Sequence, residues 1–543
     1  GDLVVDENLP PSGNADGHLW FTSSTDGKTF APPKALYERT RTKASDWAWT
    51  QAATGGIDPS SGDLYVAFEA VGSAVPVGQA QPAPAATVPP TTTGGQPFAP
   101  VSSLPGSVTT TTAAPKVEPP ANDPPAAVKF LRSTDNGKTW TAGAKAATQS
   151  GDDSVNVDQS GALYLGNLNN IEANSNTLQA SVYKSTDGGK SWPQQGTSLG
   201  GNNASSMPFL VDRPWTDAWI PSQKTTKQAL VYVQYHDFGP GVVWVNSSTD
   251  GGKTFGTPVN VINCPTAVAA SACNAMPGGV KVVQSGPHAG RVYVAWLAAD
   301  DAQNGATGCN ETQLAGFHTM WVAWSDDGGA TWTDQLVYDG GIGRDGSEFW
   351  PDITLDNKGN PYVAFAMNIG SEFDIWISAS FDGGKTWNGQ SDGTGAPFQA
   401  NIGKGTHYFP AIAAGAPGKV AVTYLGTSTV VGTRPNGKPD PTTDTAAKWN
   451  AYLSESYNIR AKKPVFHEVK VSPKPMHDGD VCTLGLFCAA VPGTDRNLLD
   501  FIDVQVDPRG FAHVVYTDDK NYPQGAIVAG NQIAGPRLGR GGH

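Results

Sequence analysis

One phrase recurs along the chain and decides its fold. Residues 133–140 read Ser-Thr-Asp-Asn-Gly-Lys-Thr-Trp, and close copies occupy residues 185–192, 248–255, 325–332 and 380–387, with a shorter copy at 24–30. The central aspartates of the six copies are Asp26, Asp135, Asp187, Asp250, Asp327 and Asp382. From Asp135 onward they lie 52, 63, 77 and 55 residues apart, a spacing that suits one four-stranded unit per copy.

Each copy has the composition of a tight hairpin turn. The Ser and Asp oxygens can accept hydrogen bonds from turn N–H groups, Gly supplies a positive φ, and the terminal Trp or Phe can pack into a core. Alternating strands precede the copies, such as Val-Val-Trp-Val at 242–245 and Ile-Trp-Ile at 375–377. The six aspartates are therefore expected to be structural rather than catalytic.

A second pattern, a strand, a Gly-containing turn and a Tyr-Val-Ala-Phe-like strand, occurs seven times. Its second strands lie near residues 64, 163, 231, 292, 361, 420 and 512. The first box has no strand pair before it and the last pair has no box after it, so the two chain ends are expected to join and close a ring. This count predicts an all-β fold, a single seven-bladed β-propeller of four-stranded antiparallel blades whose last blade is closed by both termini. Six or eight blades remain alternatives.

The blade boundaries follow from these repeats. The propeller is expected over residues 1–519, with 17–36 and 498–519 forming the closing blade and the other blades at 46–145, 152–197, 207–262, 276–338, 348–390 and 408–472. Residues 72–126 form a Pro/Thr-rich insertion, with thirteen prolines from Pro76 to Pro125, that cannot bury a core and is expected to be extended or disordered. Residues 520–543 are expected to be a Gly-rich tail.

Composition excludes several other classes of protein. With 64 Gly, 42 Pro and only 16% charged residues, the 543-residue chain is unlike a coiled coil or helical bundle. Its net charge of −13 disfavours a nucleic-acid partner, and no apolar run reaches the roughly 18 residues of a membrane helix. The chain begins at Gly1 without a starting methionine, which is consistent with a processed mature form.

The five cysteines bear on the compartment. None has C-x-x-C or zinc-site spacing, and two disulfides with one thiol left over would be typical of a secreted or cell-surface protein. Five reduced cysteines are the alternative. The disulfide candidates are Cys264, Cys273, Cys309, Cys482 and Cys488.

The boxes resemble the Asp-box, or BNR, repeats of the sialidase superfamily. The resemblance covers nearly the whole chain outside the insertion and the tail, and it implies a propeller whose ligands bind near the axis on the face opposite the boxes. It implies no single function, because that group includes enzymes, receptors and assembly factors. The Arg-Ile-Pro motif that marks sialidases near the first blade is absent, so no catalytic residue carries over by motif.

The candidate site residues lie on the loops that reach the face opposite the boxes. The substrate-binding candidates are Trp47, Arg213, His236, Asp237, Arg344, Trp350, His407 and Arg496. The catalytic candidates, for an enzyme, are Asp152, Asp153, Glu348 and Tyr408. Inter-blade core packing is the competing explanation for the tryptophans, and solvated loops for the carboxylates. No metal or cofactor is expected: loop carboxylates would suit Ca²⁺, but no D-x-D-x-D-G loop is present.

Three functions fit this set of residues. A sialidase-like hydrolase would use three arginines to hold a carboxylate and a tyrosine nucleophile; another glycosidase would use paired carboxylates. A glycan-binding, adhesion or surface-assembly module would bind without turnover. The missing motif, the acidic mouth and the long insertion favour the third, with a glycan or glycoprotein as partner, and self-assembly or a cell-surface partner as further options. The expected location is secreted or at the cell surface.

Overall fold

The architecture was established from a computed structural model of the chain. The structure describes residues 18–21, 34–38, 50–70, 75–76, 127–135, 140–144, 147–148, 150–170, 178–195, 211–221, 228–237, 242–262, 274–299, 317–341, 343–346, 350–370, 372–388, 395–432, 446–483, 498, 501–521, 526–532 and 535–539. These residues form strands, turns and loops, and none of the described segments is helical or offers an apolar helix that could cross a membrane.

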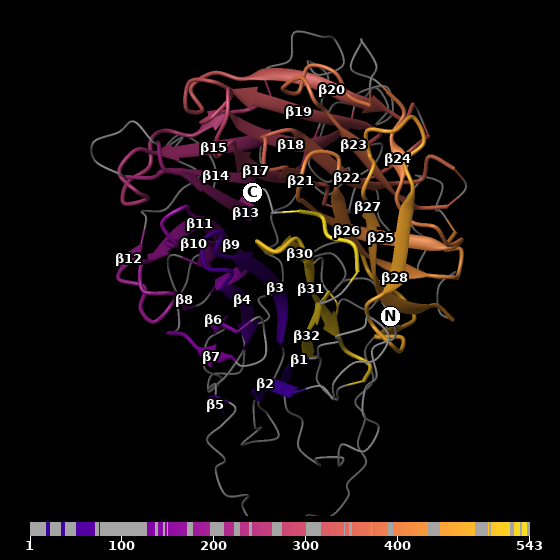
Figure 1. Ribbon diagram of the computed structural model, residues 1–543, viewed down its shortest axis with the longest axis horizontal. Coiled ribbons are helices and arrows are strands. Elements are labelled where there is room, and N and C mark those ends of the chain that lie inside the picture. Colours follow the sequence, from indigo (N-terminus) through magenta and orange to yellow (C-terminus); the bar gives the residue numbers. More distant parts are fainter. Residues whose placement is uncertain are drawn as a thin grey trace, which may run out of the picture.

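Seven sheets are arranged around one axis (Figure 1). In six of the sheets the strand that comes first in the chain is innermost, and in the sheet built from both chain ends the strand at residues 502–506 is innermost. These inner strands, called the first strands of their blades below, contact one another around a closed circle. The expected seven-bladed all-β propeller is therefore confirmed.

The blades are numbered from the first complete one. Blade 1 contains β3 (Thr50–Ile57), β4 (Leu64–Ala70), β6 (Ala127–Ser133), β7 (Thr141–Ala142) and β8 (Ala147–Thr148). Blade 2 contains β9 (Ser150–Val157), β10 (Leu163–Asn170), β11 (Leu178–Ser185) and β12 (Gln194–Gln195). Blade 3 contains β13 (Val211–Trp219), β14 (Leu230–Asp237), β15 (Val242–Ser248) and β16 (Val259–Asn260). Blade 4 contains β17 (Asn274–Val282), β18 (Val292–Ala299), β19 (Thr319–Ser325) and β20 (Thr333–Asp339).

The remaining three blades complete the circle. Blade 5 contains β21 (Asp352–Leu355), β22 (Pro361–Met367), β23 (Asp374–Ala379) and β24 (Phe398–Gln399). Blade 6 contains β25 (Thr406–Ala414), β26 (Val420–Thr427), β27 (Lys448–Ser456), β28 (Phe466–Lys470) and β29 (His477–Asp478). Blade 7 contains β30 (Ile502–Val506), β31 (Ala512–Asp518), β32 (Ala526–Asn531), β1 (His18–Phe21), β2 (Lys34–Glu38) and β5 (Val75–Pro76).

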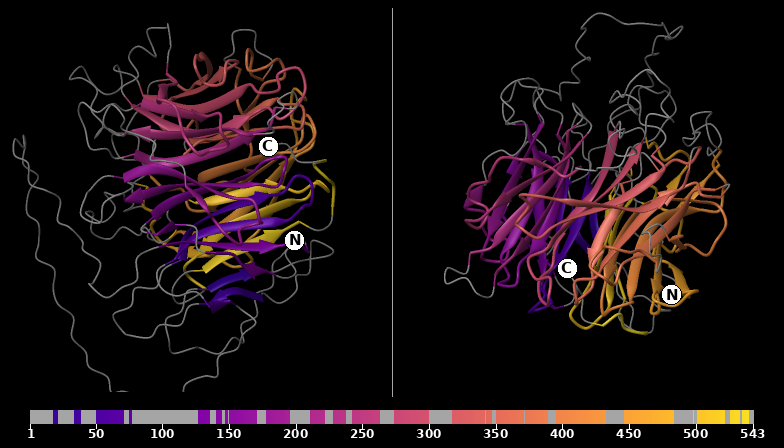
Figure 2. Two further views of the ribbon diagram at one scale, coloured as in Figure 1. Left: turned by 90° about the vertical axis from the view of Figure 1, so that its left-hand side faces the viewer. Right: turned by 90° about the horizontal axis from the view of Figure 1, so that it is seen from above.

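Both chain ends meet in blade 7, as expected, but a strand that was not predicted lies between the C-terminal strand pair and the N-terminal strands. The third strand of this blade is β32, from the tail predicted to lie beyond the propeller, and β1 pairs with it in parallel. Figure 2 shows the indigo N-terminal strands beside the yellow C-terminal ones. Val528 and Ala529 of β32 are buried, so this strand supplies the apolar side chains that a third strand needs. Further along the tail, Leu538 is fully buried and its N–H donates to the Gly510 carbonyl.

The box turns close on themselves, as the sequence predicts. In blade 4 the Ser325 hydroxyl donates to Asp327 at 2.7 Å and accepts from the Gly329 N–H at 2.8 Å. Asp327 also accepts from the N–H and the hydroxyl of Thr331, at 2.9 and 2.6 Å. Asp187, Asp250 and Asp382 sit in the same arrangement, which leaves these carboxylates occupied within the turn. Asp135 accepts from Ser133 in blade 1, and Asp26 lies outside the described residues.

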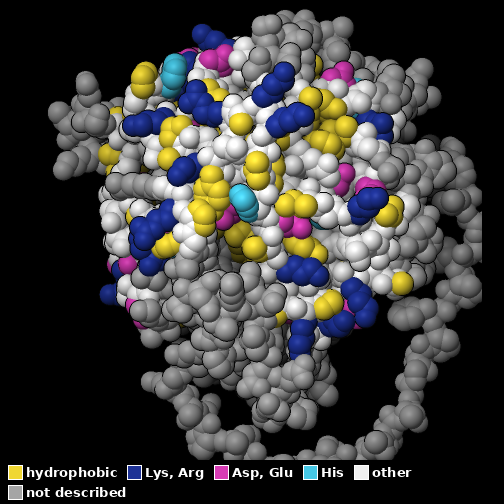
Figure 3. All heavy atoms as spheres, turned by 45° about the vertical axis from the view of Figure 1, so that its right-hand side comes forward, with side chains coloured by type: hydrophobic (Ala, Val, Ile, Leu, Met, Phe, Trp, Pro, Cys, Tyr) yellow, Lys and Arg dark blue, Asp and Glu magenta, His cyan; other side chains and the backbone are white. Residues whose placement is uncertain are grey.

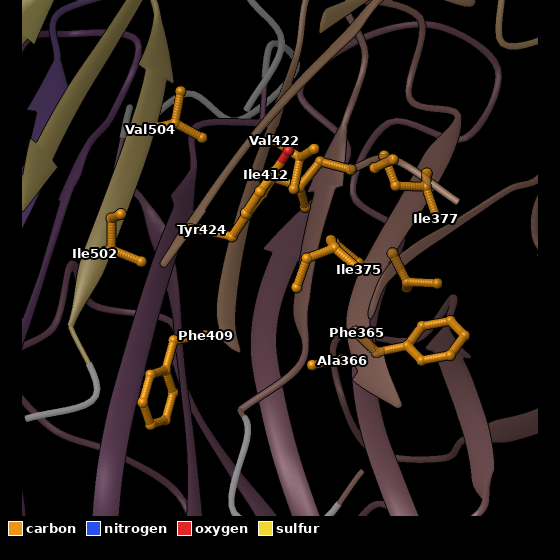
Figure 4. Packing of buried hydrophobic residues seen from close by; sticks show 14 of the residues in the cluster. Phe365, Ala366, Ile375, Ile377, Phe409, Ile412, Val422, Tyr424, Ile502 and Val504 are labelled. Atoms are coloured by element: carbon orange, nitrogen blue, oxygen red, sulfur yellow. The ribbon is translucent and has the colours of Figure 1, made fainter. Parts of the chain in front are cut away.

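Large aromatic and branched side chains fill the spaces between blades. Figure 4 shows part of this core, where Phe365 and Ile375 of blade 5, Ile412 of blade 6 and Val504 of blade 7 belong to one buried cluster. The box tryptophans contribute: Trp387 is fully buried, and its indole N–H donates to the Gly384 carbonyl. This cluster extends from blade 4 to blade 7, and separate buried clusters lie between blades 1 and 2, blades 2 and 3, and blades 3 and 4.

Two other sequence predictions lie mostly outside the described residues. Of the 72–126 insertion only β5 is described, and of the five cysteines only Cys482, which is buried. The disulfide pairing and the character of the insertion therefore stay predictions.

We expect Asp327→Ala to destabilise the fold by about 1 kcal/mol near pH 6, because the carboxylate caps a turn in the way a helix cap does. The hydrogen bond from the Thr331 hydroxyl is the main cause that lowers the pKa of Asp327 to about 2, from an ordinary value of 3.8. A lowered folded-state pKa gives stability above pH 4 that is lost as the pH falls towards 2. Urea unfolding of both proteins should show the difference shrinking across this window; a constant difference would contradict the turn account. Thr331→Val, which removes one bond, should give a smaller loss.

Candidate functional site

The first strands of all seven blades surround a cavity of about 80 Å³, which has room for several water molecules. One lining residue from each blade, in chain order, is Gly55, Val155, Thr216, Val280, Pro351, Ala411 and Gln505. Because every blade contributes, the cavity lies on the ring axis and exists only when the ring is closed.

Arg213 is the hub of an aromatic cluster in this cavity. Its guanidinium carbon lies 5.0 Å from the ring centroid of Trp215, 5.1 Å from that of Trp350 and 4.3 Å from that of Phe501. The two indoles meet edge to face, with centroids 5.7 Å apart. The rings come from blade 3 and from the residues that lead into β21 and β30, so one cation joins three blades. Arg213, Trp215, Trp350 and Phe501 are called the Arg213 cluster below.

Irregularities in the first strands shape the cavity. The pairing of β13 with β14 shifts between Asp212 and Trp215, and the pairing of β25 with β26 shifts between Tyr408 and Ala411. Within these bulges Arg213 has a φ of 48° and Phe409 a φ of 53°, a left-handed conformation that residues other than glycine seldom adopt. Both side chains line the cavity. Bulges redirect side chains. The strained backbone conformations lie at the axis, and such strain is often found at functional sites.

Two carboxylates line the cavity and also connect neighbouring blades. Asp352 of β21 accepts from the N–H of Ile412 in blade 6 at 2.8 Å, and Asp503 of β30 accepts from the N–H of Gly55 in blade 1 at 2.8 Å. Deeper between blades 3 and 4, the fully buried Asp217 accepts from the N–H of Val282 at 2.7 Å. Three of the seven blade junctions are thus held by an aspartate on a first strand.

The charge balance of these aspartates depends on Lys281 of β17. Burial raises the pKa of Asp217 and that of Asp352 to about 6, and it also raises the pKa of Asp503. The positive charge of Lys281 opposes the shift in all three, while Asp503 adds to the shift of Asp352. At neutral pH this group therefore consists of three carboxylates that share one described cation.

Two hydroxyls in the cavity have no hydrogen-bond partner among the described residues. They are Ser154 Oγ of β9 and Thr216 Oγ1 of β13, both buried atoms of residues that line the cavity. Buried polar groups usually have a partner, because burying one alone costs free energy. The axial cavity therefore presents polar atoms suited to a ligand or to ordered water.

The structure brings together three of the sequence-predicted site residues. Asp153, Arg213 and Trp350 all line the axial cavity, and Asp153 is only 2% exposed. Asp152 lies next to Asp153 and has a φ of 40° at the irregularity in β9, but it does not line the cavity.

Four other predicted residues lie away from the cavity. Tyr408 is fully buried and packs against Trp449, with ring centroids 4.9 Å apart and ring planes tilted by 30°. His407 is buried beside Asp374, and His236 is buried on β14. Arg344 donates to the carbonyl oxygens of Asn368 and Gly370.

The remaining predicted residues are not placed. Trp47, Glu348 and Arg496 lie outside the described residues; Asp237 ends β14, and its side chain is outside the description. No group of three or more His, Cys, Asp or Glu side chains in the described ranges is placed to hold a metal ion. The expectation of no metal or cofactor stays a prediction.

Several residues that line the cavity were not predicted from the sequence. Lys281, Asp352 and Asp503 lie inside first strands, and Phe409 and Phe501 lie at or just before such strands. A charged residue within an otherwise apolar inner strand, as in Ile-Asp-Val at 502–504, is the sequence feature that could have identified them. Such a residue is costly in a strand buried on both faces and therefore points to a special environment.

The likeness of this chain to known proteins concerns the shape of the backbone. No protein-family model and no curated sequence matches the chain. Among solved structures, the intramolecular trans-sialidase from Ruminococcus gnavus in complex with oseltamivir carboxylate is 13% identical, over 91% of this chain and 97% of its own, with a TM-score of 0.39.

Two further solved structures show similar values. The α-L-arabinanase from Penicillium chrysogenum complexed with arabinobiose is 15% identical, over 76% and 93% of the two chains, with a TM-score of 0.39. A PL25 ulvan lyase bound to a GlcA-Rha3S unit is 11% identical, over 75% and 89%, with a TM-score of 0.44. At these identities the likeness assigns no reaction and no ligand to this chain.

Proposed function

We propose that the protein binds a glycan in its axial cavity, as a secreted or cell-surface module for glycan binding, adhesion or surface assembly. The Arg213 cluster carries this proposal. Sugar rings have apolar C–H faces that pack on indole and phenyl rings, and hydroxyl edges that need hydrogen-bond partners. The cavity offers both, since Trp215, Trp350 and Phe501 lie beside Asp352, Asp503, Ser154 and Thr216.

The sequence indicated that Arg213 could hold a substrate carboxylate, but its surroundings in the structure indicate a different role. Three rings lie within 4.3–5.1 Å of its guanidinium carbon, so the rings surround much of the cation. We infer that Arg213 fixes the mutual orientation of the rings, and that a sugar packs on ring surface that faces the cavity. A neutral or weakly charged sugar suits a lining with two cations and three carboxylates.

The second candidate function is glycoside hydrolysis, and one observation favours it. Asp352 and Asp503 both line the cavity, and the charge on Asp503 helps to raise the pKa of Asp352. Two coupled carboxyl groups, one protonated and one ionised, are what a glycosidase uses as acid and as base or nucleophile. This enzyme would rest on the aspartate pair, because Tyr408 is packed away from the cavity.

A panel of neutral and acidic oligosaccharides, read by calorimetry and by product analysis, separates the two functions. Saturable binding without product supports the module. Turnover that Asp352→Asn abolishes while binding persists supports the glycosidase. Binding by neither wild type nor Asp352→Asn, with the fold intact by circular dichroism, would refute both.

A further inference from the structure

Blade 6 differs in charge from the rest of the ring. Residues 406–478, which span its strands, hold nine Lys and Arg against five Asp and Glu, a net charge of +4, so the remainder of this −13 chain carries −17. Figure 3 brings this side of the ring forward and shows Lys and Arg more often than Asp and Glu across its described surface. The blade therefore presents a positive surface on an acidic protein.

The turn between β27 and β28 is one source of this charge. Ser456 Oγ donates to Asn458 Oδ1 at 3.3 Å and accepts from the Asn458 N–H at 3.5 Å, which repeats the box arrangement with a neutral amide in place of the aspartate. Arg460, Lys462 and Lys463 follow directly. The turn keeps the geometry of the boxes but replaces their negative charge with positive charge.

Five of the described lysines in or beside this blade are exposed. Lys404, Lys448, Lys462 and Lys463 are exposed and form no ion pair with the described residues. Lys470, at the end of β28, is also exposed and lies 5.7 Å from the ring centroid of Tyr452. Surface cations without an intramolecular ion pair are available to attract an anionic partner, and salt screens this attraction.

Exposed apolar side chains accompany these cations. Of the described residues, the exposed large hydrophobic ones are Ile402, Val430, Val465 and Val469, at 62, 49, 53 and 40%, and all belong to this region. Ile402 lies beside β28, because its N–H donates to Glu468 at 2.8 Å. Lysines on an edge strand commonly prevent aggregation, but exposed valines beside them would defeat that purpose. The combination indicates a contact surface.

The shape of the surface is a strip along the outer edge of the blade. Strand β28 is the outermost strand of blade 6 and pairs only with β27 in the described part of the chain. Its five residues span roughly 17 Å, with Lys462 and Lys463 before its start and Lys470 at its end. Cations spaced along one edge match an extended anion better than a compact one.

We propose that the outer edge of blade 6 is a second binding surface, for a linear acidic polysaccharide. Charge complementarity favours this occupant, because the blade carries a net positive charge and its exposed lysines lie along one outer strand. A flexible polyanion can follow the strip while its uncharged ring faces contact the exposed valines. The surface is separate from the axial cavity and does not depend on the function proposed for that cavity.

The test compares two triple variants of the whole protein. Lys462→Gln, Lys463→Gln and Lys470→Gln together remove the strip, whereas Lys253→Gln, Lys358→Gln and Lys385→Gln remove three exposed lysines from other blades. Binding to polygalacturonate, to dextran sulfate and to neutral dextran is measured at 20 and 200 mM NaCl. We expect the wild type to bind the acidic polymers more weakly at higher salt, the strip variant to lose at least tenfold in affinity, and the control variant to stay within twofold.

Four results would overturn the proposal. They are equal losses in both triple variants, no binding of either acidic polymer by the wild type, equal binding of neutral dextran, or self-association in light scattering that the strip variant alone abolishes. Since all six lysines are exposed, thermal unfolding should be the same for the three proteins and thus exclude misfolding as a cause.

Discussion

Lys281→Met is expected to lower the free energy of unfolding by about 3 kcal/mol at pH 7.5, because it leaves buried carboxylates without their cation. Asp217, Asp352 and Asp503 all lie within the influence of this charge, and each holds a neighbouring blade through a backbone N–H. The loss would therefore act on three blade junctions at once. Few single surface substitutions produce so large a change.

The pH dependence of this loss has a defined sign. Burial raises the folded-state pKa of Asp217 and of Asp352 to about 6, above an ordinary value of 3.8. The folded state therefore holds more protons than the unfolded state between pH 4 and 6, and for these groups stability rises as the pH falls through that window. At pH 4.5 the two carboxyls are largely protonated and need Lys281 less.

Urea unfolding followed by tryptophan fluorescence at pH 7.5 and 4.5 measures both effects. The difference between wild type and Lys281→Met should shrink clearly at pH 4.5. An equal loss at both pH values would show that Lys281 acts only by packing. Lys385→Met, an exposed lysine in a box turn, serves as the control and should change stability little at either pH.

Trp350→Ala is expected to weaken glycan binding by roughly 30-fold, about 2 kcal/mol, which is the cost typical of removing a central aromatic contact. Trp350 is 9% exposed, lines the cavity and meets both Trp215 and Arg213. Its loss removes a stacking surface and also releases the guanidinium that orders the other rings. Trp350→Phe, which keeps an aromatic face, should recover part of the affinity.

Calorimetry with the best ligand from the oligosaccharide panel measures this effect. Trp376→Ala is the matched control, since Trp376 is a partly buried tryptophan of blade 5 that does not line the cavity. The control should bind within about threefold of the wild type after correction for the folded fraction. Equal weakening in both variants would mean that lost stability, and not a lost contact, explains the result.

The fold was predictable because the same short turn sequence recurs in most of the blades. A box such as the one around Asp327 satisfies its hydrogen bonds inside a few residues, so its sequence specifies its structure without help from the rest of the chain. The place of β32 was not predictable in this way, since that strand lacks a box. It is fixed by pairing with β31 and by the burial of Val528 and Ala529.

The site was harder to predict than the fold. Arg213 and Trp350 could be assigned to the axial face from their position before the inner strands, but Tyr408 and His407 share that position and point into the core. A bulge in β25 decides which residue faces the axis, and Phe409 is the one that does. The grouping of Lys281 with Asp352 and Asp503 depends on closure of the ring, which no local pattern encodes.

A crystal structure of the protein soaked with its best-binding oligosaccharide tests the central claim most directly. The account predicts density for a sugar ring in the axial cavity, against Trp350 or Trp215, with its hydroxyls within hydrogen-bond distance of Asp352, Asp503, Ser154 or Thr216. Density for the sugar only on another surface, with the axial cavity closed by its own side chains, would contradict it.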